Sequence, residues 1–181
     1  MNVLSLFDGM SCGQLALKRA SIKYNNYFAS EIKPIAIKVA KQNFPNTIHI
    51  GDVTKLDLSI LPKIDLLIGG SPCQDFSQMK AQGKGLEGDK SKLFYEYLRV
   101  LKQIKPKYFL LENVKMKKES EQQLNEYLGI QGLHINSELV SYQKRPRIYW
   151  TNIPGASVPK DRNINFQDFK ETNYDVCKIY K

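Results

Sequence analysis

Short apolar runs alternate with stretches of helical periodicity along the first two thirds of the chain. The apolar runs are typical of buried strands and occupy residues 3–7, 24–30, 47–50, 64–68 and 108–114. Apolar residues recur at helical spacing in residues 12–22, 34–44 and 93–104. Strands that alternate with helices form βαβ units, in which helices cover both faces of a parallel sheet. The pattern therefore predicts an α/β fold with a doubly wound sheet.

The pattern changes toward the end of the chain. Residues 134–142 and 147–153 are strand-like and close together, so we expect them to form an antiparallel hairpin beside a mostly parallel sheet. We interpret residues 1–155 as a single domain, because no linker or internal repeat interrupts them. Residues 156–181 are polar with weak helical signal, and we interpret them as a C-terminal extension.

Composition narrows the class of protein. A chain of 181 residues with 42% hydrophobic and 25% charged residues fits one globular domain. No apolar stretch approaches the roughly 20 residues that a membrane span needs. No basic leader precedes the first apolar run. We therefore expect a soluble cytoplasmic protein without membrane contact.

Charge and cysteine content add two expectations. The formal net charge of +9 favours a polyanionic partner. Cys12, Cys73 and Cys177 form no CxxC pair, and three cysteines leave one over in any disulfide scheme. Neither a disulfide framework nor a zinc site is indicated, and we expect no metal.

The ends of the first three predicted strands carry residues suited to a nucleoside. Ligands of open α/β sheets bind at the carboxyl ends of the strands. The first strand is followed by FDGMSCG, whose glycines allow close approach of a ligand to the backbone. Glu31 follows the second strand and suits ribose hydroxyls, and Asp52 follows the third and suits an amine. An ordinary tight turn and solvated carboxylates remain open alternatives, since FDGMSCG is not GxGxxG.

The fourth and fifth strand ends carry a candidate nucleophile and an acid. The fourth strand leads into GGSPCQDFSQ, where Pro72 fixes the backbone before Cys73, and a thiolate is a strong nucleophile. The fifth strand ends in Glu112 and Asn113. Neighbouring parallel strands bring these ends together. The chain has two histidines, and neither is near in sequence, so the pair favours addition of sulfur to a ring that the acid protonates or hydrogen-bonds.

These motifs resemble the catalytic part of the cytosine-5 DNA methyltransferases, and most of all the de novo type and its bacterial and phage relatives. The matching segments are SLFDGMSCG, the SE of residues 30–31, GDV, GGSPCQDFS, GLEGDKSKLFYEYLRVL, FLLENV and SYQKRPRIYWTNIPG. They cover about residues 2–155. The resemblance implies the Rossmann-like fold of methyltransferases that use S-adenosylmethionine, with double-stranded DNA as substrate and a location at the nucleoid if the source is a bacterium or a phage.

The resemblance also implies a mechanism. Cys73 would attack carbon 6 of a cytosine, and Glu112 would hydrogen-bond or protonate ring nitrogen 3, which makes carbon 5 reactive toward the methyl group. The cytosine must first be flipped out of the duplex. Arg145 and Arg147 join the catalytic set, and the implied contacts to DNA or to the base are Gln74, Ser77, Asn113 and Gln143.

The same comparison implies a cofactor site at the first strand ends and beyond. Its residues are Phe7, Asp8, Gly9, Met10, Ser11, Glu31, Ile32, Asp52, Val53, Pro72 and Leu93. Residues 74–92 are rich in glycine and lysine and resemble the family's catalytic loop, which closes over DNA. Lysines in such a loop meet phosphates without reading sequence.

One departure from the family leaves several hypotheses open. Full members continue into a target-recognition region, whereas this chain ends 26 residues after Gly155. It is then either the catalytic half of a split enzyme, completed by a second polypeptide, or a truncated, inactive remnant. A noncatalytic stimulatory subunit is disfavoured because Cys73 and Glu112 are both present. A transfer-RNA methyltransferase is disfavoured because a Cys-Phe-Thr triplet is missing, and a dehydrogenase because GxGxxG is missing.

Overall fold

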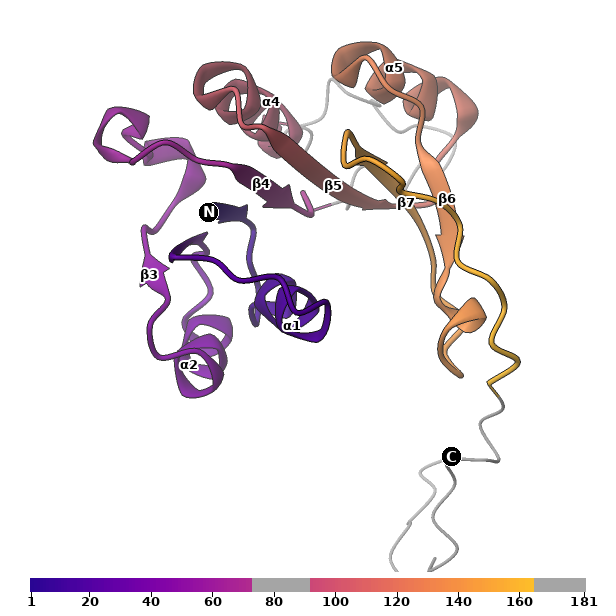
Figure 1. Cartoon of the computed structure of the whole chain (residues 1–181). Coiled ribbons are helices and arrows are strands. Elements are labelled where there is room, and N and C mark those ends of the chain that lie inside the picture. Colours follow the sequence, from indigo (N-terminus) through magenta and orange to yellow (C-terminus); the bar gives the residue numbers. More distant parts are fainter. Residues whose placement is uncertain (73–91, 165–181) are drawn as a thin grey trace, which may run out of the picture.

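A seven-stranded sheet forms the centre of the protein in the computed structural model, which describes residues 1–72 and 92–164 (Figure 1). The strand order is β3-β2-β1-β4-β5-β7-β6. The strands are β1 (Asn2–Leu6), β2 (Asn26–Ser30), β3 (Ile48–His49), β4 (Leu66–Gly69), β5 (Tyr108–Val114), β6 (Leu133–Asn136) and β7 (Pro146–Thr151).

Strand direction agrees with the expectation from the sequence. β1 pairs in parallel with β2 and β4, and the parallel pairing continues outward to β3 and β5. β7 runs antiparallel to both β5 and β6, so it lies between them. The predicted doubly wound, mostly parallel sheet with an antiparallel hairpin is therefore confirmed.

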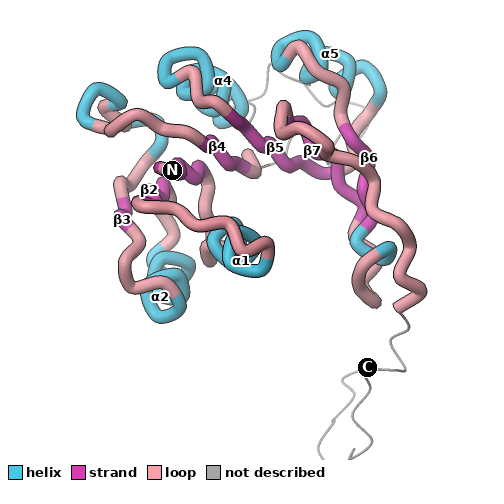
Figure 2. Tube along the Cα trace, viewed as in Figure 1, coloured by secondary structure: helices cyan, strands magenta, loops and turns pink. Residues whose placement is uncertain are grey.

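Helices lie on both faces of the sheet (Figures 1 and 2). Helices α1 (Cys12–Arg19) and α2 (Pro34–Asn43) lie on one face, beside β1, β2 and β3. Helices α4 (Lys92–Ile104) and α5 (Lys118–Leu128) lie on the other face, above β4, β5 and β7. On this side α1 reaches β5, where Tyr108 packs with the cluster that contains Leu17. In the described part of the chain, no helix lies over β7 on the α1 side.

The core has two layers because successive strand residues point to opposite faces of the sheet. Leu4 and Leu6 of β1 pack into the larger cluster, together with Phe94 and Tyr97 of α4. Val3 belongs to the smaller cluster on the α1 side, which also contains Leu17, Tyr27, Ala29 and Leu66. Both layers hold the carboxyl ends of the strands at one edge, where the predicted site residues lie.

Two predictions of local structure need correction, and one helix was not predicted. Strands and helices do not alternate strictly, because 3-10 turns η1 (Val53–Lys55) and η2 (Leu58–Ile60) replace a helix between β3 and β4. Helix α5 was not predicted, since Leu124 is its one fully buried apolar side chain among polar neighbours. The first hairpin strand ends at Asn136, whose side chain accepts from the backbone N–H of Arg145 at 2.9 Å and starts a 3-10 turn, η4 (Ser137–Leu139).

Two negative findings apply to residues 1–72 and 92–164. None of their helices combines the length and the apolar character that crossing a membrane requires. No group of three or more His, Cys, Asp or Glu side chains among them is arranged to hold a metal ion.

Candidate active site

The loop after β1 is held in a left-handed conformation by a buried polar network. Phe7, Gly9 and Ser11 have φ values of 56°, 60° and 62°, a region that non-glycine residues rarely adopt. Asp8 is 9% exposed, and its carboxylate accepts hydrogen bonds from the Tyr27 hydroxyl at 2.8 Å and from the Ser11 hydroxyl. Burial and the Asp8 charge raise the pKa of Tyr27, so its hydroxyl stays a donor at neutral pH. Asp8 therefore anchors the loop.

The network extends below the loop to α1. The Gln14 side chain donates to the Ser11 hydroxyl at 3.1 Å and to the Thr47 hydroxyl at 2.7 Å. Its oxygen accepts from the Tyr24 hydroxyl at 2.7 Å. Gln14 and Tyr27 were not predicted as site residues, because a lone polar residue in a helix or strand gives no signal of its buried partner.

Glu31 joins the end of β2 to this loop. One carboxylate oxygen accepts from the backbone N–H of Gly9 at 2.8 Å. The other oxygen accepts from the backbone N–H groups of Ile32 and Lys33, both at 2.9 Å. The side chains of Met10 and Ile32 are 56% and 66% exposed, so two apolar groups lie at the surface near a fixed carboxylate.

Asp52 caps the turn that follows β3. Its Oδ1 atom accepts from the backbone N–H and from the hydroxyl of Thr54, both at 2.9 Å. These hydrogen bonds hold the pKa of Asp52 below its usual range, so the carboxylate is ionised at neutral pH. Val53 is buried in the core, which fixes the turn against the sheet.

Glu112 lies at the end of β5 and pairs with an arginine of β7. Its Oε1 atom is 2.7 Å from Nε of Arg147. In the antiparallel register Glu112 faces Tyr149, and Arg147 lies two residues earlier on the same face of β7. Burial and the Glu112 charge raise the pKa of Tyr149. Tyr149 was not predicted as a site residue, although its position two residues after Arg147 in a strand places both on one face.

The segment before Cys73 lies beside Glu112. A Cβ atom on Gly70 would be 3.1 Å from Oε2 of Glu112, so this backbone passes close to the carboxylate. The side chain of Asn113 is buried and donates to the Ser71 hydroxyl at 3.2 Å. Asn113 thus ties β5 to the turn that leads to Pro72, whose side chain is exposed. Cys73, Gln74 and Ser77 lie outside the described residues.

Three further predicted residues, Gln143, Arg145 and Leu93, lie in other segments, although Arg145 is near enough to Tyr149 for its charge to offset part of the rise in the pKa of that residue. Gln143 and Arg145 are exposed in the segment between η4 and β7, where their backbone N–H groups donate to Ser141 and Asn136. Leu93, in the first turn of α4, is partly buried against the larger core cluster. The structure therefore brings together the loop after β1 with Glu31, and Glu112 with Arg147, and it leaves Gln143 and Arg145 at the surface.

Comparisons with known proteins agree with this arrangement. A family model described as C-5 cytosine-specific DNA methylase matches residues 1–175. The chain is 38% identical over 162 residues to the orphan methyltransferase M.Rho11sI of Bacillus phage rho11s, covering 82% of this chain and 32% of that protein. It is 35% identical over 170 residues to the type II methyltransferase M.NgoBV of Neisseria gonorrhoeae, covering 82% and 40% respectively.

Solved structures give the same fold. An E. coli prophage protein assigned as a DNA modification methyltransferase superposes with a TM-score of 0.65 at 26% identity, over 83% of this chain and 46% of that one. A mutant of DNMT2 from Spodoptera frugiperda gives 0.62 at 22% identity, over 91% and 54% respectively, a likeness of fold alone. The chain spans at most 40% of the length of the two phage and bacterial relatives named above.

Proposed function

Because the chain belongs to the C-5 cytosine-specific DNA methylase family, we propose that it transfers a methyl group from S-adenosylmethionine to carbon 5 of cytosine in DNA. The main support is the pair of Glu112 and Arg147, which lies 2.7 Å apart beside the segment that leads to Cys73. Addition of a thiolate to a pyrimidine ring requires an acid close to the thiol, so that the acid stabilises the charge that develops on the ring.

Cys73 acts as the nucleophile. Its thiolate forms a bond to carbon 6 of the cytosine, and the electron pair of the 5,6 double bond moves into the ring toward nitrogen 3. Glu112 hydrogen-bonds or protonates nitrogen 3, so the charge that develops there is stabilised. Bound S-adenosylmethionine supplies the methyl group to carbon 5. Water takes the carbon-5 proton, the bond between sulfur and carbon 6 breaks to release the thiolate, and nitrogen 3 returns its proton to Glu112, which restores the ring.

Arg147 holds the acid in position. Its guanidinium meets one oxygen of Glu112, while Gly70 leaves room beside the other oxygen. A carboxylate fixed on one side presents its second oxygen in a constant direction, which is what positioning of a reacting ring demands. The exposed Arg145 and Gln143, together with Gln74 and Ser77, contact the DNA or the flipped base in this proposal, and Asn113 positions the turn before Cys73.

The residues at the ends of β1, β2 and β3 fit the proposed cofactor. Glu31 is a carboxylate for ribose hydroxyls, and the ionised Asp52 is an acceptor for the amine of adenine. The exposed Ile32 offers an apolar surface for the purine. The left-handed loop of residues 7–11 brings the backbone close to the methionine portion, and Pro72 and Leu93 complete the proposed pocket.

The proposed substrate is double-stranded DNA, from which the target cytosine must be flipped. The net charge of +9 favours association with phosphates. Recognition of a particular sequence needs contacts to base edges, which we assign to a second polypeptide or to further sequence, in line with the share of the relatives' length that this chain spans.

Replacement of Cys73 tests this function. We expect Cys73→Ala to abolish transfer of tritiated methyl groups to DNA and to abolish the covalent adduct with 5-fluorocytosine DNA, while S-adenosylhomocysteine still binds. Cys177→Ala is the matched control, because Cys177 lies beyond the residues matched by the family model. Full transfer by Cys73→Ala would refute the cysteine mechanism, and transfer to RNA but not to DNA would refute the substrate.

A further inference from the structure

Arg99 of α4 links that helix to the turn that carries Asp52. Its Nε atom is 2.8 Å from a carboxylate oxygen of Glu96, one turn earlier on the helix. Its Nη1 donates to the side chain of Gln103 at 3.2 Å, and its Nη2 donates to the backbone carbonyl of Val53 at 2.9 Å. The guanidinium therefore has three fixed partners, and one of them belongs to the segment after β3.

A single peptide group connects the hydrogen bond between Arg99 and Val53 to the side chain of Asp52. The Val53 carbonyl and the Thr54 N–H belong to the same planar peptide, in which they point to opposite sides. The Thr54 N–H donates to Oδ1 of Asp52 at 2.9 Å. Arg99 thus fixes the orientation of a peptide whose other side holds the Asp52 carboxylate. Both Thr54 donors meet Oδ1, so Oδ2 is the oxygen available to a ligand.

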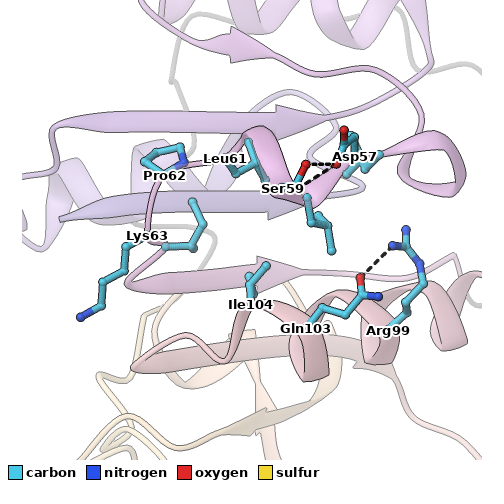
Figure 3. A pocket seen from close by; sticks show the side chains of 11 residues that line it. Asp57, Ser59, Leu61, Pro62, Lys63, Arg99, Gln103 and Ile104 are labelled. Carbon is cyan, nitrogen blue, oxygen red and sulfur yellow. Dashed lines mark hydrogen bonds between the residues drawn. The ribbon is translucent and has the colours of Figure 1, made fainter.

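An open cavity lies beside this link. A cavity of about 590 Å³ separates the segment of residues 56–64 from the last turns of α4 (Figure 3). Arg99, Gln103 and Ile104 line the helix side of this cavity, and Lys63 lies across from them. Apolar residues of the segment, such as Leu58 and Ile64, pack in the same core cluster as Tyr97 of α4, so apolar contacts also hold the segment against the helix. Arg99 adds to this packing a polar contact that reaches the peptide beside Asp52.

We propose that Arg99 is a positioning residue for the adenine end of the cofactor site, through its hold on the peptide that orients Asp52. This inference rests on the function proposed above. The same helix carries Leu93 in its first turn, so Arg99 also fixes the distance between two sides of the proposed pocket. Glu96 supports Arg99 by fixing its Nε side.

The inference is tested by cofactor binding, which needs no methyl transfer. We expect Arg99→Met to raise the Kd for S-adenosylhomocysteine, measured by calorimetry, about tenfold, the factor that loss of one hydrogen bond to a charged group produces. The KM for S-adenosylmethionine should rise by a similar factor, with kcat changed less than about twofold, since the contact is made equally before and during the reaction. Lys63→Met, which removes a charge from the same cavity, is the control and should leave Kd unchanged.

A double-mutant cycle separates positioning from a general loss of structure. If Arg99 acts through Asp52, Arg99→Met should have little further effect on Kd in an Asp52→Asn background. Arg99→Lys keeps the aliphatic part of the side chain and the charge, so its Kd should lie between those of the wild type and Arg99→Met. If Arg99→Met does not fold, Arg99→Lys replaces it in the cycle. Equal affinity of wild type and Arg99 variants, or fully additive effects, would overturn the inference. Failure of the wild-type protein to bind S-adenosylhomocysteine would instead overturn the proposed cofactor.

Discussion

The pair of Glu112 and Arg147 is best understood as a positioning contact. Their side chains are 33% and 16% exposed, so the ion pair is only partly shielded from water. Ion pairs near the surface contribute about 0–1 kcal/mol to stability. A pair with this exposure contributes little to the fold, and its value lies in the fixed direction of the Glu112 carboxyl group.

We predict that Glu112→Gln lowers the methylation rate by about 10²–10⁴, the range typical of loss of a general acid. The amide keeps the shape of the side chain and an acceptor for Arg147, but it does not donate a proton to the ring. Tritium transfer to DNA measures the rate, and calorimetry with S-adenosylhomocysteine should show Kd within about twofold of wild type. Glu138→Gln, which changes an exposed carboxyl group in η4, is the control. An unchanged rate would remove Glu112 from the chemistry.

Residue types at strand ends were predictable from the sequence, whereas their partners were not. Glu31, Asp52 and Glu112 could be assigned to one edge because parallel strands end there. The bond between Tyr27 and Asp8 joins residues 19 positions apart, and the bond between Asn113 and Ser71 joins residues 42 positions apart. A sequence shows that a buried carboxylate needs a donor, but tertiary packing decides which donor it meets.

At the scale of elements, the junction of β4 with α4 and β5 depends on two adjacent glycines with different neighbours. A Cβ atom on Gly69 would lie 2.6 Å from the ring of Tyr97, a fully buried side chain of α4. A Cβ atom on Gly70 would lie 3.1 Å from the end of the Glu112 side chain, which is able to shift. The first glycine therefore serves packing, and the second leaves room for the acid.

We predict different consequences for alanine at these two positions. Gly69→Ala should lower the free energy of unfolding by about 1–3 kcal/mol, because overpacking forces a buried ring to move. Gly70→Ala should change stability little but lower the methylation rate about tenfold to a hundredfold, since a small misplacement of a reacting group has effects of that size. Urea denaturation and tritium transfer measure the two effects. If Gly70→Ala kept the full rate, the nearness of Gly70 to Glu112 would have no bearing on catalysis.

Elements with a regular pattern were predicted well. Strand β5 has the bounds expected from the sequence, because its largely apolar run lies between lysine-rich segments. Helix α5 was missed because its polar face is wide and its apolar positions are few. The turns η1 and η2 were missed because each is held by an aspartate that caps the turn, Asp52 or Asp57, and such local contacts resemble an ordinary loop in sequence.

At the scale of the whole molecule, the two faces of the sheet are covered unequally. Leu111 of β5 is fully buried beneath α4 and α5, whereas its neighbour Leu110 points to the α1 side. Leu110 lines an apolar cavity of about 400 Å³ together with Leu17, Ile68 and Ile153. Leu111 therefore lies in a well-packed layer of the core, and its neighbour Leu110 lies in a layer that contains a cavity.

We predict that Leu111→Ala lowers the free energy of unfolding by about 2–5 kcal/mol, as for other buried leucines. Leu110→Ala should lower it by less than about half as much, since contacts on one side of Leu110 are already missing. Urea denaturation of the two variants gives the comparison, and each serves as control for the other. Equal losses would contradict the unequal packing of the two faces.

The overall class of fold followed from the sequence, but the strand order did not. Alternation of strands and helices predicted the doubly wound sheet, and the close spacing of the last two strands predicted a hairpin. Either strand of a hairpin is able to join the sheet edge, and in the structure β7 is the one beside β5. This choice matters, because β7 carries Arg147 to Glu112.

Because β7 lies between β5 and β6, the proposed chemistry depends on the register in which β7 pairs with β5. A slip of β7 by one residue would turn Arg147 to the opposite side of the sheet and put Ile148, now fully buried, in its place. The outer strand β6 holds β7 from its far edge and resists such a slip. Residues of β6, although far from any substrate contact, therefore help to keep Arg147 in register with Glu112.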